Sequence, residues 1–185
     1  MPEPSNPATV GQSSKEGSMA WQFGRTAVFT LGLAAMVAAG AARAADIVHT
    51  QSDESPIAKM VTVPAGATTY YLSGMLAPVA NPGAPKGSVE SYGDTKTQTI
   101  GALTQIRHAL VEQKLDMGDV VMMHVYLVGD PAKDGKMDFA GMMEGYKQFF
   151  GTKEQPNKPA RSTVQVAALV GPAYLVEIEV IAAHK

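Results

Sequence analysis

The sequence contains no cysteine. This absence excludes disulfides, a thiolate nucleophile and metal sites built on cysteine. Histidine does not take the place of cysteine, because no two of the four histidines are spaced two or four residues apart as paired metal ligands: His49, His108, His124 and His184. We therefore expect no metal site in this protein.

An excess of basic residues is also missing, with 15 basic and 17 acidic side chains in the chain. Residues 1–44, which we expect to be removed, hold three of the basic and two of the acidic ones. Their loss leaves 12 against 15, a net charge of about −3. A negative chain is poorly suited to binding phosphate backbones, so we expect no nucleic-acid partner.

The apolar run at residues 26–40 is too short to anchor the protein in a membrane. It follows Arg25 and has fifteen residues, whereas a transmembrane helix needs ~20. An Ala-Arg-Ala sequence that ends at Ala44 then supplies the small-residue pattern of a signal-peptidase site. We predict a disordered N-terminal region plus a cleavable signal peptide over residues 1–44, and a periplasmic or secreted protein without a stable membrane anchor. An uncleaved anchor and a start at Met19 are the alternatives.

Local patterns after the cleavage site predict the element order β-β-α-β-α-β-β. Strands are predicted by stretches rich in Val, Thr and Tyr, and helices by apolar residues at helical spacing. The expected elements are two strands within 59–76, a helix over 95–114, a strand over 119–130, a helix over 137–151, and strands over 161–170 and 174–183. This order predicts an α+β domain at 59–185, with two helices on one face of a mixed sheet, after a short segment at 45–58.

The last two predicted strands carry an unusual set of polar side chains. A tight hairpin around Gly171 would place Gln165 opposite Glu177 and Thr163 opposite Glu179. Because side chains alternate between the faces of a strand, these residues would form one polar face on the hairpin.

Arg161 begins the first of these strands and would lie on the same polar face. A guanidinium can hold a ligand carboxylate through two parallel hydrogen bonds, while a nearby glutamate orients water for attack. This combination describes a site that hydrolyses a small organic acid. The alternative is a cross-strand salt bridge of Arg161 with Glu177 or Glu179, of modest stabilising value, which spacing alone favours.

Two other features have both a structural and a functional interpretation. The pair Ser73 and Gly74 is either a simple bend or a β-bulge where the backbone approaches a ligand, and the bend is the simpler interpretation. His124 lies in an apolar strand, where a buried, hydrogen-bonded histidine is commoner than a catalytic base.

The segment PARSTVQVAALVGPAYLVEIEVIA, residues 159–182, closely resembles the RidA/YjgF family of reactive-intermediate deaminases, formerly described as endoribonuclease L-PSP. The stretches YYLSGMLAP, LDMGDVVMMHVYLV and YKQFFG support this resemblance, which extends from about Met60 to Ala183. It implies a chorismate-mutase-like α+β subunit that assembles as a homotrimer, with ligand clefts between subunits.

The resemblance also implies hydrolysis of enamine or 2-imino acids, such as 2-iminobutanoate and 2-iminopropanoate, to 2-keto acids and ammonia without a cofactor. Arg161 matches the arginine that binds the substrate carboxylate, and Glu177 matches the glutamate that orients water. Gly74 matches a glycine whose backbone lines the pocket. Three positions depart from the family pattern, with Thr163 in place of a frequent cysteine, Met60 in place of a tyrosine and Gln105 in place of a usual asparagine.

Export would separate the protein from the usual cytosolic sources of imines. A second hypothesis is therefore a non-catalytic binding module for small carboxylates such as 2-keto acids. A third hypothesis, a ribonuclease, is opposed by the negative charge and by the lack of a histidine pair for acid–base cleavage.

Overall fold

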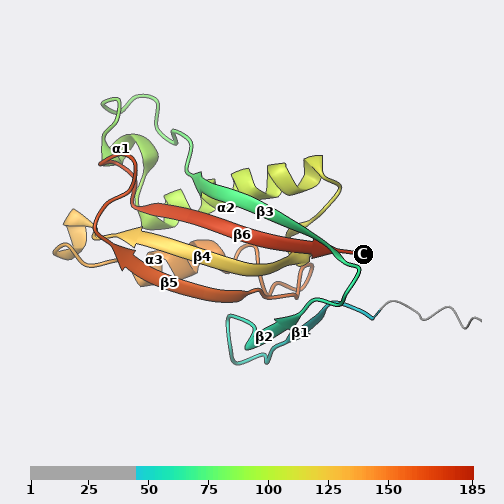
Figure 1. Ribbon diagram of the computed structural model, residues 1–185. Helices are drawn as coiled ribbons and strands as arrows, with labels where there is room; N and C mark the ends of the chain where they lie inside the picture. Colours follow the sequence, from blue (N-terminus) through green and yellow to red (C-terminus); the bar gives the residue numbers. More distant parts are fainter. Residues whose placement is uncertain (1–44) are drawn as a thin grey trace, which may run out of the picture. The chain divides into compact units, whose positions relative to one another are not determined.

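The computed structural model describes residues 45–185, so the predicted signal peptide lies outside the described residues (Figure 1). The larger sheet has the strand order β3-β6-β4-β5, and its strands are Thr68–Leu76, Val176–His184, Val120–Val128 and Ala160–Val166. A separate antiparallel pair joins β1 (Val48–Thr50) to β2 (Met60–Thr62). Sequence analysis did not predict β1.

Two main helices, α2 (Thr95–Glu112) and α3 (Phe139–Tyr146), lie on one face of the larger sheet (Figure 1). The Asp94 side chain caps α2 by accepting the backbone N–H of Thr97 at 2.8 Å. The remaining helical segments are short: α1 (Val89–Tyr92), η1 (Met117–Asp119) and η2 (Pro131–Lys133). The α+β class and the mixed sheet with two helices on one face are thus confirmed. No helix within residues 45–185 has the length and hydropathy needed to cross a membrane.

The hydrophobic core lies between these helices and the sheet. Its central side chains are less than 2% exposed and come from both layers: Leu103, Ile106 and Leu110 of α2, Met142 and Tyr146 of α3, Met123, Val125 and Leu127 of β4, and Ile178 of β6. Along most of β4, buried residues alternate with half-buried ones, so the chain itself covers only one face of this strand. The other face of the larger sheet, which we call the open face, has no covering layer within residues 45–185.

The predicted hairpin between the last two strands is wrong. β5 pairs in parallel with β4, and β6 pairs antiparallel with the other edge of β4. Gln165 therefore lies beside Leu127, and Thr163 beside Val125, instead of opposite the two glutamates. The cause is α3, because a helical crossover between β4 and β5 allows these strands to run side by side in the same direction.

The predicted helix over 137–151 is too long at its C-terminal end. α3 ends at Tyr146, and the chain continues in turns to Gly151, whose φ is 69°. Phe149 and Phe150 remain buried in these turns, so the apolar stripe continues past the helix that it predicted.

Candidate functional site

Arg161 lies near the start of β5 with its guanidinium against α3. It is paired in register with Met123, a core residue, so its side chain lies on the helix-covered face of the sheet. The guanidinium carbon is 4.3 Å from the centroid of the Tyr146 ring and 6.0 Å from that of Phe139. Its Nη2 lies 3.1 Å from the sulfur of Met143. Three side chains of α3 thus enclose the cation.

The enclosed guanidinium has no acidic partner among residues 45–185. Its Nη1 is buried without a hydrogen bond, and so is the Thr163 hydroxyl two residues along the strand. Burial lowers the pKa of Arg161 below its ordinary value. The predicted salt bridge to Glu177 or Glu179 is therefore wrong. Within residues 45–185 the one acceptor for the guanidinium is the Met143 thioether, a weak acceptor that a stronger anionic partner could replace.

The Tyr146 ring that contacts Arg161 is held in place by two neighbours. The phenol donates a hydrogen bond to the carbonyl of Pro56 at 3.0 Å, and the ring stacks on Phe150 with centroids 4.9 Å apart. Burial raises the pKa of Tyr146 to about 12, so the phenol stays neutral over the physiological range. The contact with Arg161 is therefore a cation–π interaction with a neutral ring.

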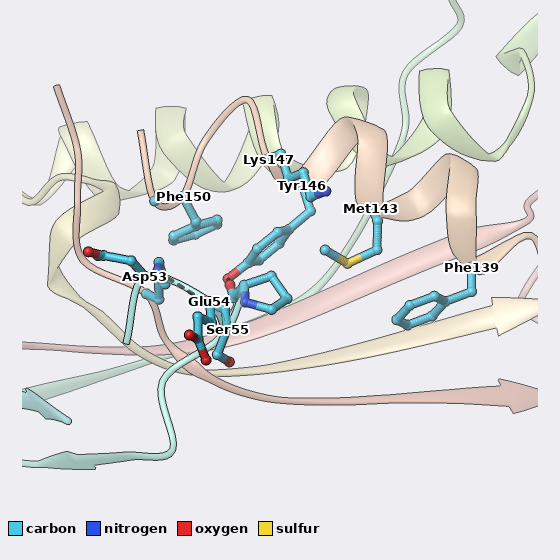
Figure 2. A pocket seen from close by; sticks show the side chains of 11 residues that line it. Asp53, Glu54, Ser55, Phe139, Met143, Tyr146, Lys147 and Phe150 are labelled. Atoms are coloured by element: carbon cyan, nitrogen blue, oxygen red, sulfur yellow. Dashed lines mark hydrogen bonds between the residues drawn. The ribbon is translucent and has the colours of Figure 1, made fainter. Parts of the chain in front are cut away.

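A cavity of about 520 Å³ adjoins this arrangement (Figure 2). Figure 2 shows side chains of α3 and the following turn along one side and those of residues 53–55 on the other. Phe139, Met143 and Tyr146 line the cavity and are also the side chains that contact the guanidinium. The cavity and Arg161 therefore share one wall.

Glu177 and Gly74 meet on the open face of the sheet. Glu177 is paired in register with Tyr126 of β4, whereas Arg161 is paired with Met123, so Glu177 and Arg161 point to opposite faces. Gly74 lies where the register of β3 shifts between Leu72 and Met75, as in a β-bulge, whereas the sequence favoured a simple bend. A Cβ at position 74 would overlap the Glu177 carboxylate. Glycine here lets that carboxylate lie against the backbone of the bulge.

One oxygen of a second carboxylate on the open face is contacted by two neighbouring side chains. Glu179 Oε1 lies 2.8 Å from His124 Nδ1 and accepts a hydrogen bond from the Tyr126 hydroxyl at 3.0 Å. This hydrogen bond raises the pKa of Tyr126. His124 is hydrogen-bonded, as expected, but it is half-buried because the single chain leaves this face open. No group of three or more potential ligand side chains in residues 45–185 is arranged to hold a metal ion.

The four residues singled out from the sequence therefore form two pairs in one chain. Arg161 and Thr163 share the helix-covered face, while Glu177 and Gly74 share the open face. Sequence reasoning missed the contribution of α3, because apolar residues at helical spacing over 137–151 predicted only a helix. These apolar residues could be recognised in the sequence, but their contact with Arg161 depends on which face of β5 lies against the helix.

Comparisons with known proteins agree with this fold. The family model described as Endoribonuclease L-PSP matches residues 50–184. YyfB of Yersinia pestis, a Rid-family protein of unknown function, is 24% identical, with 70% of this chain and 87% of that chain covered and a TM-score of 0.53. TdcF of E. coli, solved with bound serine, is 29% identical over 75% of this chain and 99% of that chain, with a TM-score of 0.49. An uncharacterized protein from Pseudomonas aeruginosa is 25% identical over 76% of this chain and 100% of that chain, with a TM-score of 0.48.

The family match includes the last residue of β1, the strands β2 to β6 and both main helices, which is nearly all of the part that the structure describes. The match thus covers well over half of the 185-residue chain. This chain belongs to the endoribonuclease L-PSP family, also known as the RidA/YjgF family.

Proposed function

We propose that the protein hydrolyses enamine or 2-imino acids to 2-keto acids and ammonia. One observation carries this proposal: Arg161 is enclosed by α3 without an acidic partner, and its Nη1 and the Thr163 hydroxyl both lack hydrogen bonds. A substrate carboxylate would replace the weak sulfur acceptor of Met143 with two strong ones. The Thr163 hydroxyl would then supply a further contact on the same face of β5.

In this proposal Glu177 orients the attacking water against the bulge at Gly74. Water adds to the imine carbon, and Glu177 passes one water proton to the imine nitrogen. The remaining hydroxyl proton then follows to the same nitrogen as the carbon–nitrogen bond breaks, which releases ammonia and leaves the keto acid. These steps use only water and side chains of the protein.

The separation of Arg161 and Glu177 supports a site shared between copies of the chain. The two side chains point to opposite faces of the sheet, so one small substrate has no route to both within a single chain. We therefore propose a homotrimer whose clefts combine Arg161 and Thr163 of one copy with Glu177 and Gly74 of the next. Exposed apolar side chains on the open face, Tyr71 at 78% and Val164 at 47%, are consistent with contact between copies.

The same separation favours a second candidate, a module that binds small carboxylates without turnover. A single chain holds the unpaired guanidinium but no carboxylate base beside it. This candidate uses Arg161 in the same way and predicts saturable binding of 2-keto acids with no change in imine hydrolysis.

One experiment separates the two candidates. An amino-acid oxidase generates a 2-imino acid in the presence of the purified protein, and the release of ammonia is followed. We expect faster release than by spontaneous hydrolysis, and we expect Glu177→Gln to abolish this acceleration while 2-oxobutyrate still binds. Saturable, Arg161-dependent binding with no acceleration by the parent protein would establish the binding module instead. No binding and no acceleration would contradict both candidates.

We further propose that the signal peptide is cleaved after Ala44 and that the protein acts in the periplasm or outside the cell. An exported enzyme that forms imines would then have to supply the substrate. RNA cleavage, which the family description names, has less support, because the mature chain is negatively charged and His124 is engaged by Glu179.

A further inference from the structure

The cavity beside Arg161 is larger than a two- or three-carbon side chain requires. Its volume of about 520 Å³ falls in the range of about 300–1,000 Å³ found for sites of drug-sized ligands. On the side from α3 and the following turn, an apolar surface is formed by Phe139, Met143, Tyr146 and Phe150, with Lys147 beside it. Because Phe139 is 44% exposed, this apolar surface remains open to an incoming group.

The opposite wall of the cavity is held firmly in place. It is formed by residues 53–56, and buried Lys158 donates hydrogen bonds from its ammonium to the carbonyls of Ser52 and Ser55, both at 2.9 Å. The Tyr146 phenol adds the hydrogen bond to the Pro56 carbonyl. Displacing this segment would leave a buried ammonium without acceptors, which is costly. The cavity is therefore preorganised rather than formed by the ligand.

We propose that this cavity is a specificity subsite that receives the substrate side chain and selects 2-imino acids with aromatic or long aliphatic side chains. This inference rests on the proposed function, because it requires the substrate carboxylate to lie on Arg161. The wall shared by Arg161 and the cavity then places the substrate side chain at the cavity's inner end. There the rings of Phe139 and Tyr146 and the sulfur of Met143 offer an apolar, polarisable surface.

Calorimetry with stable 2-keto acids tests the subsite on the full-length protein. We expect phenylpyruvate and 4-methyl-2-oxopentanoate to bind at least about tenfold more tightly than pyruvate, because each methylene added in an apolar pocket increases the affinity. Phe139→Ala should weaken phenylpyruvate binding at least about fivefold more than it weakens pyruvate binding, because Phe139 contacts both the guanidinium and the cavity. The matched control is Val111→Ala, which removes a side chain that is 60% exposed on α2 and outside this cavity.

The possible outcomes separate the subsite from the proposed function. Equal affinities for pyruvate and phenylpyruvate, or a Phe139→Ala variant that weakens both equally, would overturn the subsite and leave Arg161-dependent binding intact. If neither ligand binds in an Arg161-dependent way, both inferences are wrong. Since Phe139 is half exposed, its replacement is compatible with folding, and unchanged circular dichroism of the variant verifies this point.

Discussion

The two faces of the larger sheet satisfy their polar groups in different ways. On the open face, Glu179 is engaged by both His124 and Tyr126. On the helix-covered face, Arg161 and Thr163 keep buried polar atoms without partners. An unpaired buried polar group costs about 1–3 kcal/mol, so such groups are expected where a ligand completes the hydrogen bonding. In the proposed function, the substrate carboxylate therefore binds on the helix-covered face, and Glu177 on the open face acts on water.

The largest effect is expected from Arg161→Ala, which removes the recognition group of the helix-covered face. We expect binding of 2-oxobutyrate to weaken about 100- to 1,000-fold, because a buried carboxylate loses its charged partner. Arg107→Ala is the matched control, since Arg107 also lies over an aromatic ring, 5.6 Å from the centroid of Phe149, but lines a different cavity. Calorimetry measures both variants. Equal affinities of the two variants would contradict the assignment of recognition to Arg161.

A smaller effect is expected from ionisation of the buried Tyr146 phenol, which should lower the stability of the folded protein at alkaline pH. The pKa of Tyr146 is about 12, against about 10 in the unfolded chain, so folding favours the neutral phenol. Its stabilising contribution is complete below pH 10 and is lost as the pH rises to 12, by about 3 kcal/mol. Urea unfolding of the parent and of Tyr146→Phe at several pH values measures this loss.

The two stability curves should cross as the pH rises. At neutral pH the Tyr146→Phe variant lacks the hydrogen bond to Pro56 and should be about 1 kcal/mol less stable than the parent. Above pH 10 the parent should lose this advantage and then become the less stable of the two by about 2 kcal/mol, because only the parent has the phenol to ionise. Parallel curves between pH 10 and 12 would show that burial of Tyr146 does not control alkaline stability.

Gly74→Ala tests the role of Glu177 on the open face, and it is expected to have the smallest effect of the substitutions considered. The added Cβ would displace the Glu177 carboxylate, and we expect kcat for imine hydrolysis to fall about tenfold, part of the contribution of a general base. The KM should change little, because Arg161 lies on the other face. Gly83→Ala is the control, since a Cβ there meets only the Asn81 side chain at 3.4 Å. A rise in KM with unchanged kcat would place Gly74 in binding instead.

Local sequence patterns predicted most elements of the fold because their causes are local. The helical spacing in α2 depends only on neighbours in the chain, whereas the register shift at Gly74, where the sequence favoured a simple bend, also involves the pairing of β3 with β6. The pairing of β5 was mispredicted because it depends on the crossover through α3 and on the central place of β4 in the sheet. A short Gly-Pro sequence near Gly171 looked like a tight hairpin, although it lies in a loop between strands that do not pair.

The candidate site could be predicted only in part, for a related reason. The family resemblance supplied the residue types at Arg161 and Glu177, and their roles remain predictions. Whether their side chains share a face depends on strand pairing, so sequence alternation alone placed them together wrongly. The same error hid the contact of Arg161 with Tyr146, since a strand's orientation towards a distant helix leaves no local pattern.

The most direct test of a shared site mixes two inactive variants. Arg161→Ala and Glu177→Gln are unfolded together in equal amounts and refolded, and imine hydrolysis is compared with that of the parent treated in the same way. If each cleft takes Arg161 from one copy and Glu177 from the next, random assembly restores both groups in about one quarter of the clefts. We therefore predict about one quarter of the parent activity from the mixture. Activity no higher than that of the separate variants would contradict the shared site.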